Sequence, residues 1–268
     1  MPVRCAHSIA NLSTDEFGEL DYRVMGHAFD MHNELGRLAD ERIYQADLAA
    51  RIETTGMRTR REFKIQLSHQ SFCKSLFVDF VVADRGVYEL KAVKKITDAH
   101  LGQLLTYLLL LDLSHGKIID FGSSEVESKF VNATLDSESR RAFRINASDY
   151  RGEDHFRDLV IELLRDWGTS LTLSLYIEAI EHLLGGNQVA TAMLPLNRNG
   201  VPLGNQRFQL ASSDTAFRLT AMKQGLDAFQ KQLSRLVLHS PLQAIHWVNI
   251  AHALVTFRTI RRASCKVW

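Results

Sequence analysis

Three charged residues, Asp79, Glu89 and Lys91, interrupt the two apolar runs of the segment SLFVDFVVADRGVYELKAVKK. Strands this apolar are usually buried on both faces, where an unpaired charge costs on the order of several kcal/mol. The charges are therefore paired or bound to a metal ion. Two carboxylates beside an ammonium suit phosphodiester hydrolysis. A hard cation such as Mg²⁺ prefers oxygen ligands, and the ammonium can orient or activate a metal-bound water, or stabilise charge on a phosphate.

The turn between the two runs decides whether these side chains meet. A three-residue loop, Asp84-Arg85-Gly86, suits a type I turn followed by a left-handed residue, a conformation that glycine adopts readily. The residues flanking the loop then pair, and Asp79 lies opposite Lys91. Because alternate residues of a strand share a face, Glu89 joins them. We expect three converging charges; the alternative is a structural salt bridge between Asp79 and Lys91.

Two helices expected on either side of the hairpin add polar side chains. The downstream helix carries Gln103 and Tyr107, four residues apart and so on one face. The upstream helix carries Glu41 and Tyr44 on one face. The structural alternatives are a satisfied Gln–Tyr pair and a first-turn acid that the helix dipole favours.

These residues belong to a mixed α/β arrangement, with the order α-α-β-β-β-α-β up to about residue 122. Helices are expected over 14–36, 40–56 and 97–113, and strands over 61–69, within the hairpin 75–95, and over 116–123. A polar stretch follows, with room for one strand and a linker. Beyond it, helices are expected over 155–168, 170–186 and 225–239, and strands over 188–195, 201–210, 215–222, 243–249 and 254–259.

The chain resembles the PD-(D/E)xK nuclease superfamily over roughly residues 20–122. The segments VDF, YELK and QLLTY carry the resemblance, and the last is similar to the Gln-x-x-x-Tyr helix of RecB-type exonucleases. MHNELGRLADERIY further resembles the GxxExxY proteins of that superfamily, although it departs from them at Arg37 and Leu38. The matching positions are His32, Leu35, Gly36, Glu41 and Tyr44.

The resemblance implies a restriction-endonuclease-like mixed sheet flanked by helices and a site that holds Mg²⁺ or Mn²⁺. Asp79, Glu89 and the Leu90 carbonyl would ligate the metal, with His32 as a further ligand. Lys91 would act on the attacking water. The residues that would support the site are Glu41, Gln103 and Tyr107.

The second half repeats the order of elements in the first. VYELKAVKKITDAHLGQLL aligns without gaps with AFRLTAMKQGLDAFQKQLS, and KIIDF with QAIHW; the run from Gly36 to Tyr44 matches in length that from Gly168 to Tyr176. Such self-similarity predicts a tandem duplication; the alternative is chance similarity of two α/β stretches. The copy lacks the chemistry, because Asp79, Glu89, Lys91 and Glu41 align with Phe208, Arg218, Thr220 and Leu173. We expect a nuclease-like domain over 1–150 and a degenerate one over 151–268.

Composition fits this interpretation without adding to it. The chain has 268 residues, 46% of them hydrophobic, and a net charge of +1, so it supports a full core but does not declare a nucleic-acid binder. Three scattered cysteines, no signal peptide and no membrane-length apolar run favour the cytoplasm.

The prediction is a metal-dependent nuclease acting on DNA, either a monomeric pseudo-dimer or a homodimer, with no membrane partner. Basic residues for phosphate contact could come from the runs RTRREFK and RTIRRASCK or from Lys94 and Lys95. The alternatives are a non-catalytic nucleic-acid-binding or assembly protein on a nuclease fold, and an RNA-directed phosphodiesterase.

Overall fold

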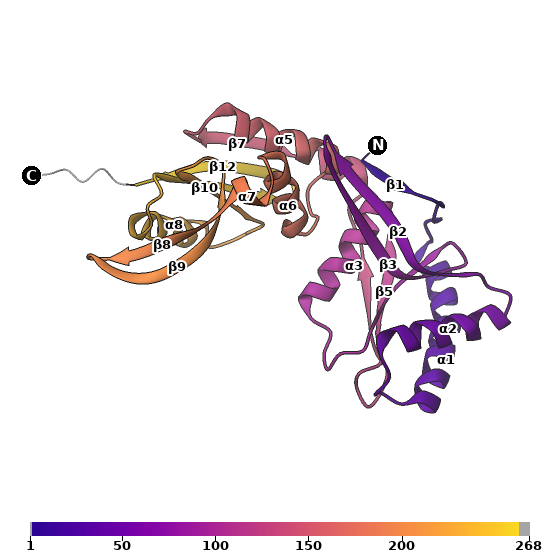
Figure 1. Ribbon diagram of the computed structural model, residues 1–268. Coiled ribbons are helices and arrows are strands. Elements are labelled where there is room, and N and C mark those ends of the chain that lie inside the picture. Colours follow the sequence, from indigo (N-terminus) through magenta and orange to yellow (C-terminus); the bar gives the residue numbers. More distant parts are fainter. Residues whose placement is uncertain (1, 263–268) are drawn as a thin grey trace, which may run out of the picture. The chain divides into compact units, whose positions relative to one another are not determined.

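The computed structural model describes residues 2–262 and divides them into two compact units (Figure 1). Unit 1 contains residues 2–68 and 73–137, and unit 2 contains residues 69–72 and 138–262. Each unit is built around a six-stranded mixed sheet flanked by helices, which confirms the predicted fold class. Within the described residues, no helix has the length and apolar character needed to cross a membrane.

Unit 1 has the sheet order β1-β2-β3-β4-β5-β6. β4 and β5 are parallel, because helix α3 crosses over between them, whereas β3–β4 and β5–β6 are antiparallel. Its elements are β1 (Val3–Cys5), α1 (Thr14–Leu35), α2 (Glu41–Thr54), β2 (Thr59–His69), β3 (Phe72–Val82), β4 (Gly86–Lys91), α3 (Asp98–Leu111), β5 (His115–Asp120) and β6 (Glu127–Asn132).

Helices cover both faces of this sheet. Tyr88 and Leu90 of β4 pack in one core cluster with residues of α1 and α2. Val87 of the same strand packs in another cluster with Leu104 and Leu108 of α3. Alternate residues of β4 therefore enter two different cores, which explains why its sequence is apolar almost throughout.

The β3–β4 register differs from the predicted one by two residues. Val82 pairs with Gly86, so the loop is 83–85 rather than 84–86. Ala83 and Asp84 have φ of 54° and 53°, while Gly86 is not left-handed. Space also favours glycine at position 86, since a Cβ there would lie 2.7 Å from a Leu20 methyl and 2.9 Å from Tyr88 Cε2, and these side chains would have to shift. Continuing this register places Asp79 opposite Glu89, so the predicted pairing of Asp79 with Lys91 is wrong. The shift is even, so the same side chains still share a face, as predicted.

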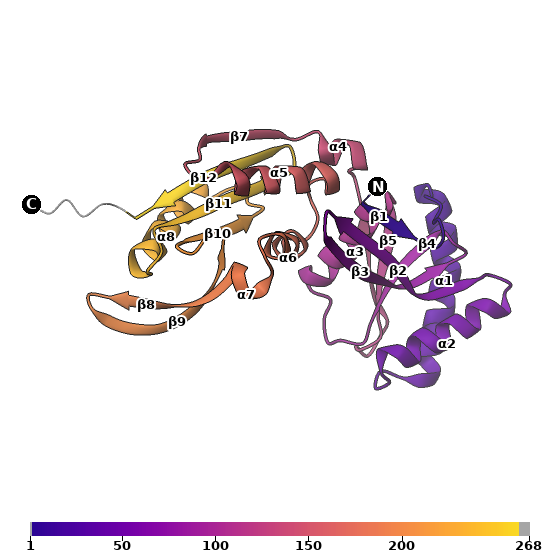
Figure 2. The same ribbon diagram turned by 45° about the horizontal axis from the view of Figure 1, so that its top comes forward.

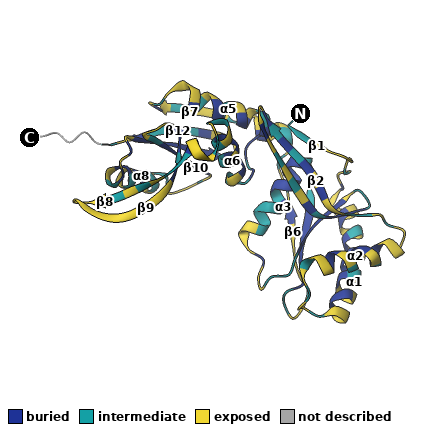
Figure 3. Ribbon diagram, in the orientation of Figure 1, coloured by how far each residue is buried: buried dark blue, intermediate teal, exposed yellow. Residues whose placement is uncertain are grey.

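Unit 2 has the sheet order β7-β12-β11-β10-β9-β8. Leu233 and Val237 of α8 pack on one face of this sheet, and Phe156 of α5 contacts Phe217 on the other. Figure 2 shows the course of both helices along the sheet. The β8–β9 hairpin is largely exposed (Figure 3). The elements are β7 (Arg144–Asp149), α5 (Asp154–Trp167), α6 (Leu173–Leu183), α7 (Asn187–Ala190), β8 (Thr191–Arg198), β9 (Val201–Leu210), β10 (Thr215–Thr220), α8 (Leu226–His239), β11 (Ala244–Ala251) and β12 (Leu254–Arg261).

The polar stretch in the middle of the chain is more ordered than expected. It contains β6, the short helix α4 (Ser137–Arg141) and β7. The boundary of the compact units lies after Ser137 rather than at 150, because β7 pairs with β12. The strand predicted from residue 188 begins at Thr191, after the one-turn helix α7.

The two sheets share a pairing scheme with a constant numbering offset. Phe80 pairs with Tyr88 in unit 1 and Gln209 with Phe217 in unit 2, and the residue numbers differ by 129. The parallel pairs obey the same offset, since Asp120 lies beside Lys91 and Asn249 beside Thr220. The alignment of KIIDF with QAIHW is therefore wrong by three residues: Lys117 corresponds to His246.

The loops before α2 and α6 also share their hydrogen bonds. The Tyr44 hydroxyl donates to the Gly36 carbonyl at 2.7 Å, and the Tyr176 hydroxyl donates to the Gly168 carbonyl at 2.6 Å. In each loop the same hydroxyl accepts a backbone N–H bond at 3.2 Å. Both glycines have left-handed φ, 68° and 77°. These matching details favour the duplication that the sequence predicts.

Candidate active site

The Lys91 ammonium lies at the centre of the charged cluster in unit 1. Its Nζ is 2.8 Å from Glu89 Oε1 and 3.0 Å from Asp79 Oδ2. It also donates to the Leu90 carbonyl at 2.9 Å. The two carboxylates and the carbonyl that the family resemblance implies as metal ligands thus converge on a single cation, here the ammonium. Asp79 Oδ2 also accepts the Leu90 N–H at 3.0 Å.

Glu89 is the most deeply buried member of the cluster. Its side chain has no exposed surface, and its Oε2 has no hydrogen-bond partner among the described residues. Burial, reinforced by the charge of Asp79, raises the pKa of Glu89 to about 8. Burial opposes the charged form of Lys91, but the charges of Glu89 and Asp79 outweigh it and raise the Lys91 pKa. The lysine is therefore an ammonium at neutral pH.

Glu41 approaches the cluster from the first residue of α2. Its Oε2 is 3.8 Å from Lys91 Nζ. Burial raises the pKa of Glu41, with Lys91 opposing the shift. Gln45, one turn later, contacts Glu41 Oε1 at 3.5 Å and lines a cavity of about 560 Å³ together with Arg42, Arg61 and Glu62. The cluster thus adjoins a cavity with two arginines.

Gln103 and Tyr107 form the predicted pair on α3. Gln103 Nε2 donates to the Tyr107 hydroxyl at 3.0 Å. Burial raises the pKa of Tyr107 to about 12, and the charges of Glu89 and Asp79 add to the shift. The pair is thus present as predicted, and its supporting role at the carboxylates stays a prediction.

His32 lies in a packed environment at the end of α1. Its Nε2 is 3.2 Å from the Ser123 carbonyl oxygen, and its ring stacks against Phe121 at 6.4 Å between centroids. Across residues 2–262, no three His, Cys, Asp or Glu side chains are grouped to hold a metal ion. These contacts favour a packing role, and His32 as a metal ligand stays a prediction.

Asp120, at the end of β5, is an acid beside the site that the sequence analysis missed. It is fully buried, lies next to Lys91 in the parallel pair, and contributes to the raised pKa of Glu41. Its Oδ1 accepts the Val93 N–H at 2.9 Å, whereas Oδ2 has no partner in the described part of the chain. The sequence signal that could have identified Asp120 is its place as an acid at the end of the apolar strand that follows the crossover helix.

The donor set fits a hard divalent cation. Two carboxylates and a carbonyl are the oxygen ligands that Mg²⁺ accepts, and Mg²⁺ completes its shell with water. The unsatisfied buried oxygen of Glu89 is the feature that a cation would relieve. When bound, such an ion would lower the pKa of a water and polarise a phosphoryl oxygen.

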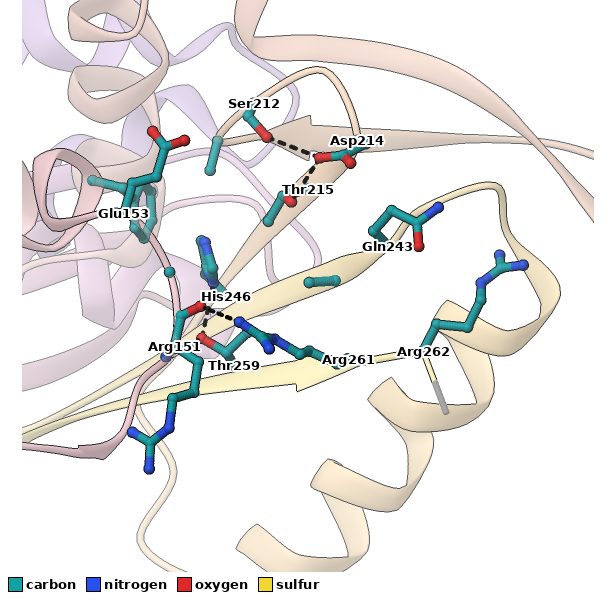
Figure 4. Close-up of a pocket in the computed structure, with 14 residues that line it drawn as sticks. Arg151, Glu153, Ser212, Asp214, Thr215, Gln243, His246, Thr259, Arg261 and Arg262 are labelled. Carbon is teal, nitrogen blue, oxygen red and sulfur yellow. Dashed lines mark hydrogen bonds between the residues drawn. The ribbon is translucent and has the colours of Figure 1, made fainter. Parts of the chain in front are cut away.

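A cavity of about 560 Å³ in unit 2 has different chemistry (Figure 4). Arg261 donates to the Arg151 carbonyl at 2.7 Å, and Arg262 donates to the Leu242 carbonyl at 3.2 Å. Both guanidinium groups are therefore hydrogen-bonded to backbone oxygens. Burial lowers the pKa of His246, in the cavity wall, to about 4. Among the described residues that line the cavity there are neither converging carboxylates nor a lysine between them.

Comparison with known families finds one match, to the PD-(D/E)XK nuclease superfamily over residues 18–132. The match begins within α1, contains all the residues of the charged cluster, and ends with β6. Together with the mixed sheet, it supports the restriction-endonuclease-like class. Comparison with curated proteins and with solved structures gives no match.

Proposed function

We propose that the protein is a divalent-metal-dependent nuclease that hydrolyses phosphodiester bonds of DNA in unit 1. The observation that carries the proposal is the Lys91 ammonium held by Asp79, Glu89 and the Leu90 carbonyl. Lys91 has three N–H donors, and these three oxygens accept all of them. A structural salt bridge would use the same contacts, so the feature that favours a metal site is the buried Glu89 Oε2, which has no hydrogen-bond partner in the described residues.

Each residue has a distinct role in this proposal. Asp79, Glu89 and the Leu90 carbonyl hold Mg²⁺ or Mn²⁺, and Lys91, being protonated, donates to the attacking water or to a phosphate oxygen. Glu41, 3.8 Å from Lys91, orients that ammonium or the water. Gln103 and Tyr107 support the buried carboxylates from α3.

The arginines beside Glu41 supply substrate contacts. Among the basic residues near the start of β2, Arg60 and Arg58 lie 2.5 Å and 3.9 Å from Asp84. Arg61 has no such carboxylate partner in the described residues and lines the cavity with Arg42. Glu62, with φ of 49°, interrupts the alternation of β2, so Arg61 is exposed instead of buried. Both arginines are suited to phosphate oxygens.

A cleavage assay with and without Mg²⁺ on linear DNA, closed circular DNA and RNA tests the proposal. We expect metal-dependent loss of DNA. Binding without cleavage would support the non-catalytic alternative, and cleavage confined to RNA would replace DNA as the substrate.

Metal affinity is expected to depend on pH through Glu89. The carboxyl must lose its proton before it can bind a cation, and its pKa is about 8. The affinity for Mn²⁺ should therefore fall about tenfold for each pH unit below about 8 and level off above it. Calorimetric titration should give one site per chain and proton release on binding at pH 7. Two equivalent sites, or a pH-independent affinity, would contradict this assignment.

Free single strands are expected to be degraded faster than closed circular duplex. The Gln103–Tyr107 helix is similar to that of nucleases that work on free or single-stranded ends. Because extracting a nucleotide from a duplex costs on the order of a few kcal/mol, the rates should differ at least about tenfold. Gel assays of both substrates at equal nucleotide concentration provide the measurement. Equal rates would remove this expectation while leaving the metal site in place.

Unit 2 is proposed to be a second copy of the nuclease module that lost its catalytic residues. The constant offset of 129 between the two sheets supports this. In the copy, Phe208, Arg218 and Thr220 stand at the positions of Asp79, Glu89 and Lys91. A guanidinium at the place of a buried carboxylate opposes the binding of a cation.

A further inference from the structure

Unit 2 has a cavity of about 180 Å³ at the position of the charged cluster in unit 1. The shared register identifies this position, since β9, β10 and α8 correspond to β3, β4 and α3. Four of the lining residues correspond to Asp79, Glu89, Gln103 and Tyr107, namely Phe208, Arg218, Gln232 and Leu236. The position that corresponds to the charged cluster is thus a cavity in unit 2, with a different lining.

Thr220, which corresponds to Lys91, does not line this cavity. The Thr220 hydroxyl donates to Asn249 Oδ1 and accepts from Trp247 Nε1, both at 2.8 Å. Thr220 is buried and does not line the cavity. No carboxylate lines it either, so within the described residues the cavity offers no ligand set for a divalent cation.

The new lining combines aromatic rings, amides and a guanidinium. Phe208 and Phe229 contribute rings, and Gln232 contributes an amide. Arg218 is exposed, and the described part of the chain gives it no hydrogen bond or ion pair. Arg207, at the same cavity, is 2.9 Å from Asn187 Oδ1 and 3.9 Å from Glu181 Oε1. Arg218 is therefore the lining arginine that is available to an anionic ligand.

We propose that this cavity binds one base of a single-stranded nucleic acid, with Arg218 on an adjacent phosphate. Its volume is below the roughly 300 Å³ of sites for larger ligands and suits one planar ring. Aromatic rings beside a basic group are the combination that single-strand binders use, and amides can hydrogen-bond base edges. A base in a duplex is stacked and paired, so it could enter only after extrusion. This inference rests on the proposed nucleic-acid substrate.

Binding of a short labelled DNA oligonucleotide, measured by fluorescence anisotropy in EDTA, tests the proposal without cleavage. We expect Arg218→Gln and Phe229→Ala each to raise Kd about tenfold for the single strand. Arg235→Gln is the control, because Arg235 is an exposed arginine of α8, the helix that carries Phe229, and does not line the cavity. Its Kd should remain near that of the wild type. Equal weakening by Arg218→Gln and Arg235→Gln would show only general electrostatics and would overturn the proposal.

An oligonucleotide with abasic sites isolates the base contact. Removing the bases should weaken binding to the wild type about as much as Phe229→Ala does, and Phe229→Ala should add little to that loss. Additive losses would overturn the base assignment. Arg218 is exposed, so its variant tests the proposal even if Phe229→Ala unfolds.

The outcomes separate this inference from the proposed function. If the wild type cleaves DNA and both cavity variants bind like wild type, only the cavity assignment fails. If the cavity variants lose binding but the wild type never cleaves, the cavity assignment stands and the nuclease proposal fails.

Discussion

Asp79→Ala is expected to abolish metal-dependent cleavage, with a loss of at least about a thousandfold. Asp79 is one of two carboxylates on the central cation, and its Oδ2 also anchors the Leu90 backbone. Its removal leaves too little negative charge to hold a divalent ion beside Lys91. Calorimetry should show that Mn²⁺ binding is lost together with activity, while circular dichroism shows an unchanged fold.

Lys91→Ala should lose cleavage to a similar extent for a different reason. The variant keeps Asp79, Glu89 and the Leu90 carbonyl, so metal binding should persist while catalysis stops. Lys129→Ala, an exposed lysine on β6, is the control and should cleave like wild type. Near-wild-type cleavage by a folded Asp79→Ala or Lys91→Ala variant would falsify the catalytic assignment.

Asp21→Ala is expected to lower the free energy of unfolding of unit 1 by about 3–5 kcal/mol. Asp21 of α1 is 2.6 Å from Lys117 of β5, and their side chains are 8% and 6% exposed. Lys117 Nζ also lies 4.2 Å from the Phe130 ring centroid. Burial raises the pKa of Asp21, which shows that desolvation outweighs the attraction to the lysine. The alanine variant leaves the lysine charge buried without its partner.

Replacing both Asp21 and Lys117 distinguishes the effect of the ion pair from that of side-chain packing at the same place. Asp21→Leu with Lys117→Met should be near neutral or stabilising, because no buried charge remains. Asp154→Ala, which removes an exposed partner of Arg157, is the control and should change stability by less than about 1 kcal/mol.

Urea unfolding followed by circular dichroism, with hydrogen exchange of the β5 peptide, measures the effect on unit 1. Fluorescence of the buried Trp247 reports on unit 2 and should move little. A change below about 1 kcal/mol in Asp21→Ala would refute the role of the pair.

The sequence predicted which side chains converge but not the turn that brings them together. Alternation along β3 and β4 decides the face, and any even shift preserves it. The turn itself depends on tertiary space. Gly86 suggested a left-handed position, yet the space beside Leu20 is what favours glycine there, and Ala83 and Asp84 adopt positive φ instead. Nothing local in the hairpin sequence reveals a neighbour from α1.

Elements that depend on distant partners were also missed. β1 has three residues and exists because it pairs with β2. β7 pairs with β12, far along the chain, and the polar stretch that holds β6 and β7 was expected to contain one strand, not two. Asp120 was missed because its neighbours come from another part of the chain. The crossover through α3 brings Lys91 beside it, and the Val93 backbone N–H donates to its carboxylate.

The hydrogen bonds of Tyr44 have a consequence for how the chain tolerates change. Tyr176 makes the same bonds to its own loop, although Leu173 stands there in place of Glu41 and no charged cluster needs positioning. Under the proposed duplication, the glycine and the tyrosine are retained where the charged residues are not. Folding of this loop then constrains these two residues independently of activity. Within the run from Gly36 to Tyr44, we expect variation at Glu41 to be compatible with a folded chain and variation at Tyr44 to be removed in every copy, active or not.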